Sequence, residues 1–229
     1  MMTPQSEQHW EAWLGNASAA PLVDPILVAL DREFGKEPAP EVTQRAVERT
    51  RQRLVTEQCP VDYESIPETP IGPVYVSVTS GGLASVAIGG TEAEFVAMLR
   101  KQGAAPMVRS GERAQPVKAQ IEEYFRGERD HFDCPVDLSQ LTAFPRQVLQ
   151  AAARIPRGSV MTYGGLARML GKPRAARAVG RALATNPVPL VIPCHRVIAS
   201  DGSLGGYSAR GGVSTKLRLL RFEGAPVIG

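Results

Sequence analysis

Hydrophobic and polar positions alternate in the middle of the chain, and the alternation predicts a β-hairpin. Valine occupies every second position from 74 to 78, the pair Gly81-Gly82 interrupts the run, and a second apolar stretch covers residues 83–88. Two short alternating runs on either side of a double glycine are typical of antiparallel strands joined by a tight turn. The sequence therefore predicts a hairpin over residues 73–88.

Helical and strand-like patterns follow the hairpin. Thr91 precedes Glu94 by three residues, which is the spacing of a capping box, and predicts a helix that ends near Lys101. A second helix is predicted over residues 115–126, where a proline falls in the first turn. Residues 133–138 predict a further strand. These elements together indicate a small α/β domain.

The C-terminal third predicts three helices. The first covers residues 144–154 and the second covers residues 163–170, with Thr162 as its cap. A turn at Gly171-Lys172 separates the second helix from a third, which is predicted over residues 173–185. Two helices joined by a short glycine turn indicate a helix-turn-helix unit.

The same patterning divides the chain into three parts. Residues 1–65 form an N-terminal extension of unknown role, in which residues 21–34 and 41–57 predict two amphipathic helices. Residues 66–139 form the α/β domain, and residues 140–229 form the helix-turn-helix domain. The fold class predicted is α+β.

Composition narrows the class of protein. The chain has 229 residues, of which 43% are hydrophobic and 21% are charged, and no apolar run approaches the length of a membrane span. The N-terminus is polar and shows no signal peptide, and three cysteines do not indicate a disulfide framework. We expect a monomer in a reducing compartment, the cytoplasm, nucleoid or nucleus, without a membrane partner.

Charge is distributed unevenly. From residue 160 onward there are ten Lys or Arg and two acidic residues, a net charge of +8, whereas the whole chain carries +3. Residues 1–159 therefore carry −5. A basic segment that also predicts a helix-turn-helix indicates binding to a polyanion such as DNA, although a solvated basic face is the alternative.

Candidate chemistry is concentrated at Cys194-His195, which follows an apolar run. A thiol near its usual pKa of about 8.5 is only a few per cent ionised at neutral pH, and an imidazole held by a carboxylate can take its proton. Glu223 is a candidate for that carboxylate. The alternative is an unreactive buried cysteine beside a surface histidine. His131 and Cys134 have a spacing found in metal sites, but two ligands do not predict a zinc site, and we expect no metal and no cofactor.

Motifs over residues 162–224 resemble those of the O6-alkylguanine-DNA alkyltransferases, also called methylated-DNA–protein-cysteine methyltransferases. Their order and spacing carry the resemblance, which extends more weakly back to about Ile71. The motifs are Thr162-Tyr163-Gly164, Pro173-Arg174-Ala175-Ala176-Arg177-Ala178-Val179-Gly180, Asn186-Pro187-Val188-Pro189, Ile192-Pro193-Cys194-His195-Arg196-Val197-Ile198, Gly205-Gly206-Tyr207-Ser208, Leu219-Leu220 and Glu223-Gly224.

The resemblance implies roles for five residues in catalysis. Cys194 is the alkyl acceptor, His195 removes its proton through a water, and Glu223 orients His195. Tyr163 presses on the target phosphate and protonates the leaving guanine, and Asn186 is a hinge before the Cys194 loop. It also implies that the α/β domain has a ribonuclease-H-like fold and that the C-terminal domain is winged-helix-like.

The family pattern further implies contacts with DNA and with the target base. Arg177 fills the space of an extruded nucleotide while the helix around it enters the minor groove, which its alanines permit. The DNA-binding residues expected are Arg177, Ala176, Ala178, Arg174 and Arg181. The residues expected around the base are Val197, Ser208, Tyr207 and Pro189.

The function implied is direct, single-turnover transfer of an alkyl group from O6-alkylguanine, and from O4-alkylthymine, in double-stranded DNA to Cys194. Two alternatives stay open. One is a protein that recognises alkylated bases without transfer, against which the presence of Cys194 argues. The other is a cysteine hydrolase, for which no oxyanion-hole motif is found.

Overall fold

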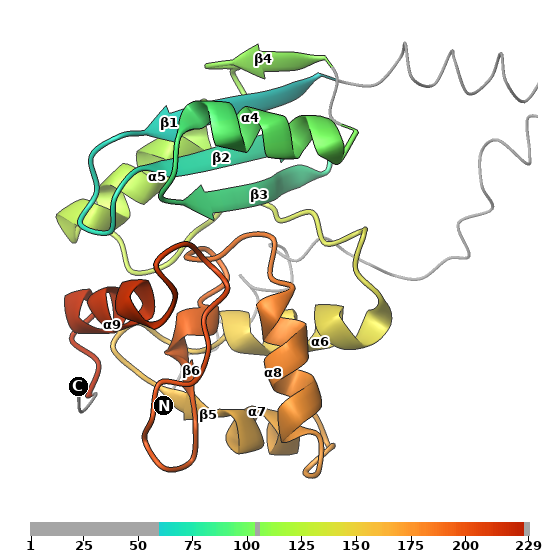
Figure 1. Ribbon diagram of the computed structural model, residues 1–229, viewed down its shortest axis with the longest axis vertical. Helices are drawn as coiled ribbons and strands as arrows, with labels where there is room; N and C mark the ends of the chain where they lie inside the picture. The colour runs from blue at the N-terminus through green and yellow to red at the C-terminus, as the bar shows by residue number, and fades with distance from the viewer. Residues whose placement is uncertain (1–59, 104–105, 227–229) are drawn as a thin grey trace, which may run out of the picture. The chain divides into compact units, whose positions relative to one another are not determined.

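The computed structural model describes residues 60–103 and 106–226. These residues belong to one compact unit that starts at Pro60, and its fold is mixed α+β (Figure 1). The two helices predicted over residues 21–34 and 41–57 lie outside the described residues.

A four-stranded sheet forms the first half of this unit (Figure 1). The strand order is β3-β2-β1-β4, with β1 antiparallel to β2 and parallel to β4. Helix α4 covers one face and helix α5 the other (Figure 1). The strands are β1 (Val61–Ile66), β2 (Val74–Thr79), β3 (Gly82–Ile88) and β4 (Met107–Arg109), and the helices are α4 (Glu92–Lys101) and α5 (Gln115–Arg126).

The predicted hairpin is confirmed as β2 and β3, which pair in an antiparallel register from Val74–Ile88 to Thr79–Gly82. Gly82 has a φ of +116°, and a Cβ atom there would lie 2.5 Å from the Pro135 carbonyl oxygen. The turn therefore needs glycine for its backbone conformation and for the close approach of the next segment.

Strand β1 was not predicted, and it crosses the boundary expected between residues 65 and 66. It pairs with β2 over residues 62–66, so the sheet begins at Val61. The hydrophobic pattern is hidden because Asp62 and Glu64 point to the buried side, where Arg113 and Gln115 bind their carboxylates. A strand with paired carboxylates on its inner face lacks the apolar alternation by which strands are predicted.

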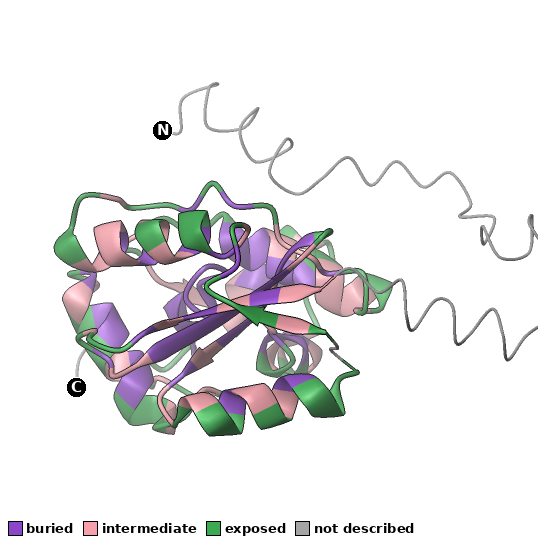
Figure 2. Ribbon diagram, turned by 90° about the horizontal axis from the view of Figure 1, so that it is seen from above, coloured by how far each residue is buried: buried purple, intermediate pink, exposed green. Residues whose placement is uncertain are grey.

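The two helices of the sheet layer follow the sequence signals. Thr91 and Glu94 form the expected capping box at the start of α4, and Pro116 lies in the first turn of α5. Phe95 and Leu99 of α4 pack on Tyr75 in one core cluster. In Figure 2 the inner strands are largely buried, and the outer sides of the helices are exposed.

The strand predicted over residues 133–138 is wrong. Only a single bridge joins Val136 to Leu83, with Leu83 N–H donating to the Pro135 carbonyl at 2.8 Å and Asp137 N–H donating to the Leu83 carbonyl at 2.9 Å. Pro135 has no N–H to donate, and the Ser139 N–H donates instead to Asp137 Oδ1 at 2.9 Å, so the ladder extends on neither side.

The second half of the unit consists of helices and one short strand pair. The parallel pair of β5 and β6 joins the segment before α7 to the segment after Cys194. The elements are α6 (Ala143–Ala153), β5 (Met161–Thr162), α7 (Tyr163–Met169), α8 (Ala176–Ala184), the 3-10 turn η1 (Cys194–Arg196), β6 (Val197–Ile198) and α9 (Gly212–Phe222).

Helices α6 and α7 agree with the prediction, and Thr162 caps α7 by accepting from the Gly165 N–H at 2.9 Å. Helix α8 starts at Ala176, three residues later than predicted. Pro173 instead lies in a turn that is closed by the Ala175 N–H and the Lys172 carbonyl at 2.9 Å. Arg174 therefore precedes the helix rather than lying on it.

Within residues 60–103 and 106–226, none of the helices combines the length and apolar character that crossing a bilayer requires.

Candidate active site

The Cys194 thiol lies at the start of η1, after a buried segment. Residues 188–192 are buried, and Cys194 itself is only 6% exposed. The Asn186 side chain fixes this segment: its Nδ2 donates to the Ile192 carbonyl at 2.9 Å and to Cys194 Sγ at 3.2 Å, while its Oδ1 accepts from the Val188 N–H at 3.1 Å. Asn186 therefore ties the end of α8 to the thiol.

His195 is fully buried and its ring contacts Glu223. The distance from His195 Nε2 to Glu223 Oε1 is 2.8 Å. The other ring nitrogen, Nδ1, is buried without a hydrogen-bond partner among the described residues. The pair predicted from the sequence is thus in contact.

Arg196 holds the same carboxylate on two sides. Its Nε donates to Glu223 Oε2 at 2.9 Å and its terminal NH2 donates to Oε1 at 2.8 Å, while NH1 reaches the Ile155 carbonyl. A bidentate pair between guanidinium and carboxylate fixes the plane of both groups. Glu223 is therefore held rigidly next to His195.

Helix α9 brings Glu223 and Lys216 to one buried face. Lys216, Leu219 and Leu220 are buried on α9, and Glu223 caps its end. The spacing of three, four and seven residues gives one face of a helix. The Lys216 Nζ donates to the carbonyls of Val197 and Leu204, each at 2.5 Å.

A cavity of about 570 Å³ opens next to the thiol. Helices α7 and α8, the η1 turn and the loop before α9 all contribute to it. Its lining residues are Tyr163, Arg177, Gly180, Arg181, Leu183, Ala184, Cys194, Gly206, Tyr207 and Ser208. A cavity of this size with a mainly apolar wall suits a flat, base-sized ligand.

Tyr163 lines the same cavity because the pairing of β5 with β6 brings the start of α7 next to the segment that follows Cys194. Its ring is 5.8 Å from the Lys216 Nζ, and a Cβ on Gly205 would lie 2.9 Å from its hydroxyl. Burial raises the pKa of Tyr163. At neutral pH its hydroxyl is therefore protonated and able to donate.

Helix α8 presents arginines and small residues to the cavity mouth. Arg177 and Arg181 are exposed, lie one turn apart and both line the cavity together with Gly180. Ala176 and Ala178 are half-buried on the same helix, and Arg174 is exposed in the turn before it.

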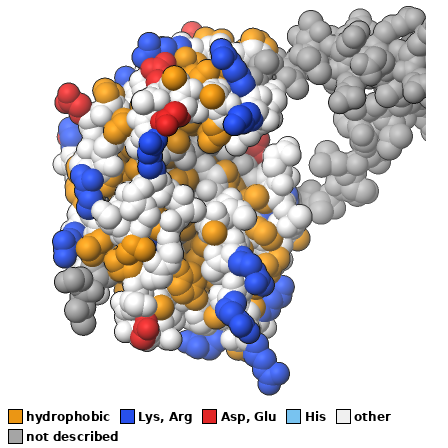
Figure 3. Space-filling model, viewed as in Figure 1, with side chains coloured by type: hydrophobic (Ala, Val, Ile, Leu, Met, Phe, Trp, Pro, Cys, Tyr) orange, Lys and Arg blue, Asp and Glu red, His pale blue; other side chains and the backbone are white. Residues whose placement is uncertain are grey.

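Lys and Arg side chains gather on the part of the surface that α7 and α8 form (Figures 1 and 3). Those exposed along this stretch are Arg168, Lys172, Arg174, Arg177 and Arg181. No Asp or Glu occurs between residues 140 and 200. The cavity mouth therefore opens within a positively charged surface, as a polyanion-binding site requires.

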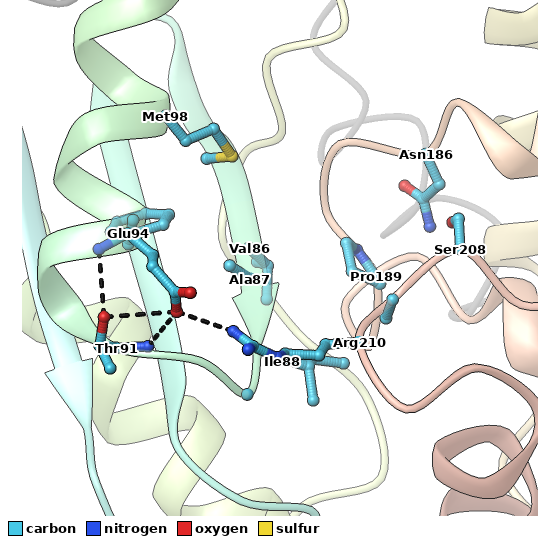
Figure 4. A pocket seen from close by; sticks show the side chains of 13 residues that line it. Val86, Ala87, Ile88, Thr91, Glu94, Met98, Asn186, Pro189, Ser208 and Arg210 are labelled. Atoms are coloured by element: carbon cyan, nitrogen blue, oxygen red, sulfur yellow. Dashed lines mark hydrogen bonds and ion pairs between the residues drawn. The ribbon is translucent and has the colours of Figure 1, made fainter.

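A second cavity, of about 270 Å³, lies on the other side of the loop before α9 (Figure 4). Asn186, Pro189, Ser208 and Arg210 line it from the loop side, and α4 lines it from the sheet side. The Arg210 guanidinium pairs with Glu94 at 2.7 Å across it (Figure 4). Pro189 thus lines this cavity, whereas Ser208 contributes to both.

Burial and charge set the protonation states at the site. Burial raises the pKa of the Cys194 thiol, while the Asn186 donor and the Lys216 charge act against the rise. Burial also lowers the pKa of His195, despite the Glu223 carboxylate. The hydrogen bonds from His195 and Arg196 hold the pKa of Glu223 well below its usual range, although burial opposes them. At neutral pH the site therefore contains a thiol, a neutral imidazole and a carboxylate.

The carboxylate fixes the tautomer of His195. An ionised carboxylate only accepts hydrogen bonds, so His195 Nε2 must carry the proton that faces Glu223. His195 Nδ1 is then left with a free lone pair. This is the arrangement of an oriented base beside a candidate nucleophile.

Most of the site residues expected from the sequence meet at this place, whereas Arg174, Ala176, Ala178 and Pro189 do not line the larger cavity. Cys194, Tyr163, Arg177, Tyr207 and Ser208 line the larger cavity, and His195, Glu223 and Asn186 lie behind the thiol. Val197 is buried, and its carbonyl accepts from Lys216.

Three residues with close contacts to the site were missed. Arg196 lies next to His195 in the chain, but its pairing with Glu223 was not expected. Lys216 could have been found because it lies seven residues before Glu223 on the face that carries Leu219 and Leu220. Tyr124 of α5 donates to Glu223 Oε1 at 2.5 Å over a separation of 99 residues, and no local signal reveals such a contact.

The described residues contain no group of three or more His, Cys, Asp or Glu side chains arranged to hold a metal ion. His131 interacts with its neighbours Asp130 and Asp133, and Cys134 is buried, with a pKa that burial raises to about 12.

Comparison with known proteins agrees with this geometry. A family model described as the DNA-binding domain of 6-O-methylguanine DNA methyltransferase matches residues 143–225. A methylated-DNA–protein-cysteine methyltransferase of Methanosarcina acetivorans is 36% identical over 164 residues, which span 71% of this chain and 99% of the relative. A methyltransferase of the same name from Salmonella typhimurium is 49% identical over 104 residues, which span 45% of this chain and 60% of the relative.

Solved structures are similar as well. The crystal structure of Mycobacterium tuberculosis OGT in complex with DNA has 34% sequence identity and a TM-score of 0.60, and the match covers 72% of this chain and 96% of that one. The sequence matches and the structural match lead to the same family. The chain belongs to the family of methylated-DNA–protein-cysteine methyltransferases.

Proposed function

We propose that this chain repairs DNA by moving the alkyl group of an O6-alkylguanine to Cys194 in a single turnover. One observation carries the proposal: the Cys194 thiol lines a base-sized cavity, and the buried His195–Glu223 pair lies directly behind it. The positively charged surface around the cavity mouth supports DNA as the molecule that delivers the base.

Deprotonation of Cys194 is the first step that the site must perform. Because burial raises the pKa of the thiol, the resting sulfur is not ionised and needs a base at the moment of attack. His195 Nδ1 takes the proton through a water, and Glu223 stabilises the imidazolium through the Nε2 proton. His195 is the catalytic base and Glu223 orients it.

The transfer step exchanges one bond for another. The thiolate sulfur forms a bond to the alkyl carbon while the bond from that carbon to guanine O6 breaks. The electron pair remains on the guanine, which takes a proton from the Tyr163 hydroxyl. The tyrosinate that is left regains a proton, through water, from the His195 imidazolium, so both residues end neutral. The product is a thioether on Cys194 and an unmodified guanine.

The thioether explains why one protein would repair one lesion. A carbon–sulfur bond of this kind is not activated, and breaking it would need a second nucleophile. Cys134, the other cysteine among the described residues, does not line this cavity. The same chemistry would accept the alkyl group of O4-alkylthymine.

Base extrusion follows from the position of the thiol. Guanine O6 lies at the base-pair edge inside the stack, so the nucleotide must rotate out before Cys194 can attack in line. Arg177, exposed at the cavity mouth, fills the vacated space, and Tyr163 presses on the target phosphate. Arg174 and Arg181 neutralise neighbouring phosphates, and Ala176 and Ala178 let α8 approach the minor groove closely.

Recognition of the extruded base uses backbone groups around the cavity. The carbonyls of Cys194 and Val197 and the Ser208 N–H would contact the guanine, with Tyr207 at its side. The Val197 carbonyl has a second lone pair free to accept from the base while Lys216 occupies the first. Asn186 acts as the hinge between α8 and the Cys194 turn. Pro189, expected at the base, lines the second cavity instead.

We also infer a finer architecture for the two halves of the unit. The sheet with α4 and α5 corresponds to a ribonuclease-H-like domain, and α7 and α8 to the helix-turn-helix of a winged-helix-like domain. A monomer acting in the cytoplasm, nucleoid or nucleus fits this function. The division of the chain into an extension over residues 1–65, a domain over residues 66–139 and a domain over residues 140–229 stays a prediction.

Mass spectrometry after incubation with a duplex that carries O6-methylguanine tests the function. The expected result is a gain of one methylene on the peptide that contains Cys194, together with loss of the lesion. The control is Cys194→Ser, which should bind the duplex and repair nothing. Binding without any mass gain in the unaltered protein would indicate a recognition protein, and repeated turnover of an ester would indicate a hydrolase.

A further inference from the structure

Tyr124 links the sheet half of the unit to the candidate catalytic carboxylate. It lies on α5, its side chain is fully buried, and its hydroxyl donates to Glu223 Oε1 at 2.5 Å. This hydroxyl has no role in the chemistry proposed above, although it contacts the same oxygen as His195 Nε2. The contact joins residues that are 99 positions apart in the chain.

The Tyr124 ring is fixed by its surroundings. Phe132 and Phe222 pack on it with ring centroids at 5.3 and 5.6 Å, and the Arg157 guanidinium lies 5.1 Å from its centroid. Arg157 also lies 5.0 Å from the centre of the Phe222 ring. These contacts fix the ring in an orientation in which its hydroxyl is directed at Glu223.

The hydroxyl completes the set of donors around the carboxylate. Glu223 Oε1 accepts from His195 Nε2, from the Arg196 NH2 and from Tyr124, whereas Oε2 accepts from the Arg196 Nε. We propose that Tyr124 is a positioning residue for alkyl transfer, whose hydroxyl holds the Glu223 carboxylate in register with His195 and moderates the charge that His195 feels.

A phenol suits this role because it remains a donor over the whole working range of pH. Burial and the Glu223 charge raise the pKa of Tyr124 far above its usual value, so the hydroxyl keeps its proton. A donor to the carboxylate draws negative charge away from the bond to His195. Without it, the carboxylate would favour the protonated imidazole more strongly.

Other charged and titratable groups also face the His195–Glu223 pair, and none of them is altered by a substitution of Tyr124. Arg196 and Lys216 oppose a positive charge on His195, and Cys194 lies beside it. Arg157 faces the Tyr124 ring. Burial raises the pKa of the Tyr207 hydroxyl, and the Cys194, Tyr124 and Glu223 charges add to the rise. Because each of these groups is retained when only the Tyr124 hydroxyl is changed, a shift can be assigned to that hydroxyl.

Two substitutions perturb the hydroxyl in opposite directions. Tyr124→Phe deletes it and leaves the ring packing, whereas a ring-fluorinated tyrosine incorporated at position 124 makes it a stronger donor. Tyr75→Phe is the matched control, because Tyr75 is also buried in the sheet half and donates its hydroxyl to a backbone carbonyl, that of Gly90, at 3.2 Å.

The first measurement is an NMR titration of full-length protein with ¹⁵N-labelled histidine, which follows the tautomer and the pKa of His195. We expect Tyr124→Phe to raise the pKa of His195 by roughly half a unit and the fluorinated tyrosine to lower it. Tyr75→Phe should leave it unchanged. Equal values of the His195 pKa in the unaltered protein and in the fluorinated variant would overturn the proposal, even if Tyr124→Phe did not fold.

The second measurement is the single-turnover rate of methyl transfer from an O6-methylguanine duplex as a function of pH. In Tyr124→Phe the acid limb of the profile should shift to higher pH, by the same amount as the His195 pKa. At a fixed pH on that limb the rate should therefore be roughly threefold lower. A purely structural tyrosine would leave the limb in place. This role in transfer rests on the proposed function, but the NMR titration needs no transfer, so failure of one is distinguishable from failure of the other.

Discussion

Replacing Glu223 with glutamine removes a negative charge from the centre of a buried cluster. The carboxylate accepts four hydrogen bonds, from His195 at 2.8 Å, from Arg196 at 2.8 and 2.9 Å and from Tyr124 at 2.5 Å. Glutamine keeps the shape but offers one acceptor oxygen, and it turns an amide donor toward the Arg196 guanidinium. The Arg196 charge, on a residue only 5% exposed, would then lack its counter-ion.

The expected loss of stability is large for a single change of this size. Removing one partner of a buried ion pair typically costs about 3–5 kcal/mol. A domain of this kind has an unfolding free energy of roughly 5–15 kcal/mol in total. Transfer should also slow by about 10²-fold, because the neutral amide no longer stabilises an imidazolium on His195.

Urea unfolding at pH 7.5 measures the first effect, and single-turnover methyl transfer measures the second. Glu94→Gln is the control, because it makes the same substitution in an ion pair whose side chains are more than half exposed. The control should lose far less stability. If Glu223→Gln were as stable as Glu94→Gln and transferred at the normal rate, the buried Glu223 charge would contribute neither to stability nor to transfer.

Three further predictions concern the DNA contact, the cavity wall and pH. Arg177→Ala should slow repair in duplex DNA by at least tenfold yet leave alkylation by a free O6-alkylguanine base unchanged, because only the duplex needs its vacated space filled; equal losses in both assays would argue against that role. Gly205→Ala should slow transfer in both assays, since the glycine has a φ of +66° and a Cβ would crowd the Tyr163 hydroxyl; an unchanged rate would contradict the contact. The free energy of unfolding in urea should fall as the pH drops below about 6.5, by up to about 1.4 kcal/mol per pH unit. Burial lowers the pKa of His195 in the folded state, so below this pH only the unfolded chain takes up the proton. A flat profile from pH 8 to 5 would contradict a buried neutral imidazole.

Local signals predicted the elements that depend on local interactions. The double glycine of the hairpin, the Thr91–Glu94 capping box and the Thr162 cap all form as expected. Strand β1 was missed because its buried face carries Asp62 and Glu64, whose partners come from a segment some fifty residues later. From the sequence pattern alone, a buried carboxylate that is paired with a distant residue cannot be distinguished from an exposed carboxylate.

The family motifs predicted more of the site residues than the hydrophobic periodicity or the distribution of charge did. The Cys194-His195 pair and its distant Glu223 were recognisable in the sequence, and the structure adds how closely they are held. The contributions of Tyr124 and Lys216 depend on tertiary packing, since one lies on α5 and the other binds carbonyls 12 and 19 residues away. Such contacts cannot be read from spacing along the chain.

Single-turnover transfer to Cys194 is tested by the stoichiometry of repair. A fixed amount of protein is incubated with a large excess of O6-methylguanine duplex, and the lesions removed are counted until the reaction stops. Removal should stop at one lesion per protein molecule, with the methyl group on Cys194. Removal that continues past one equivalent, or a methyl group found on a different residue, would contradict it.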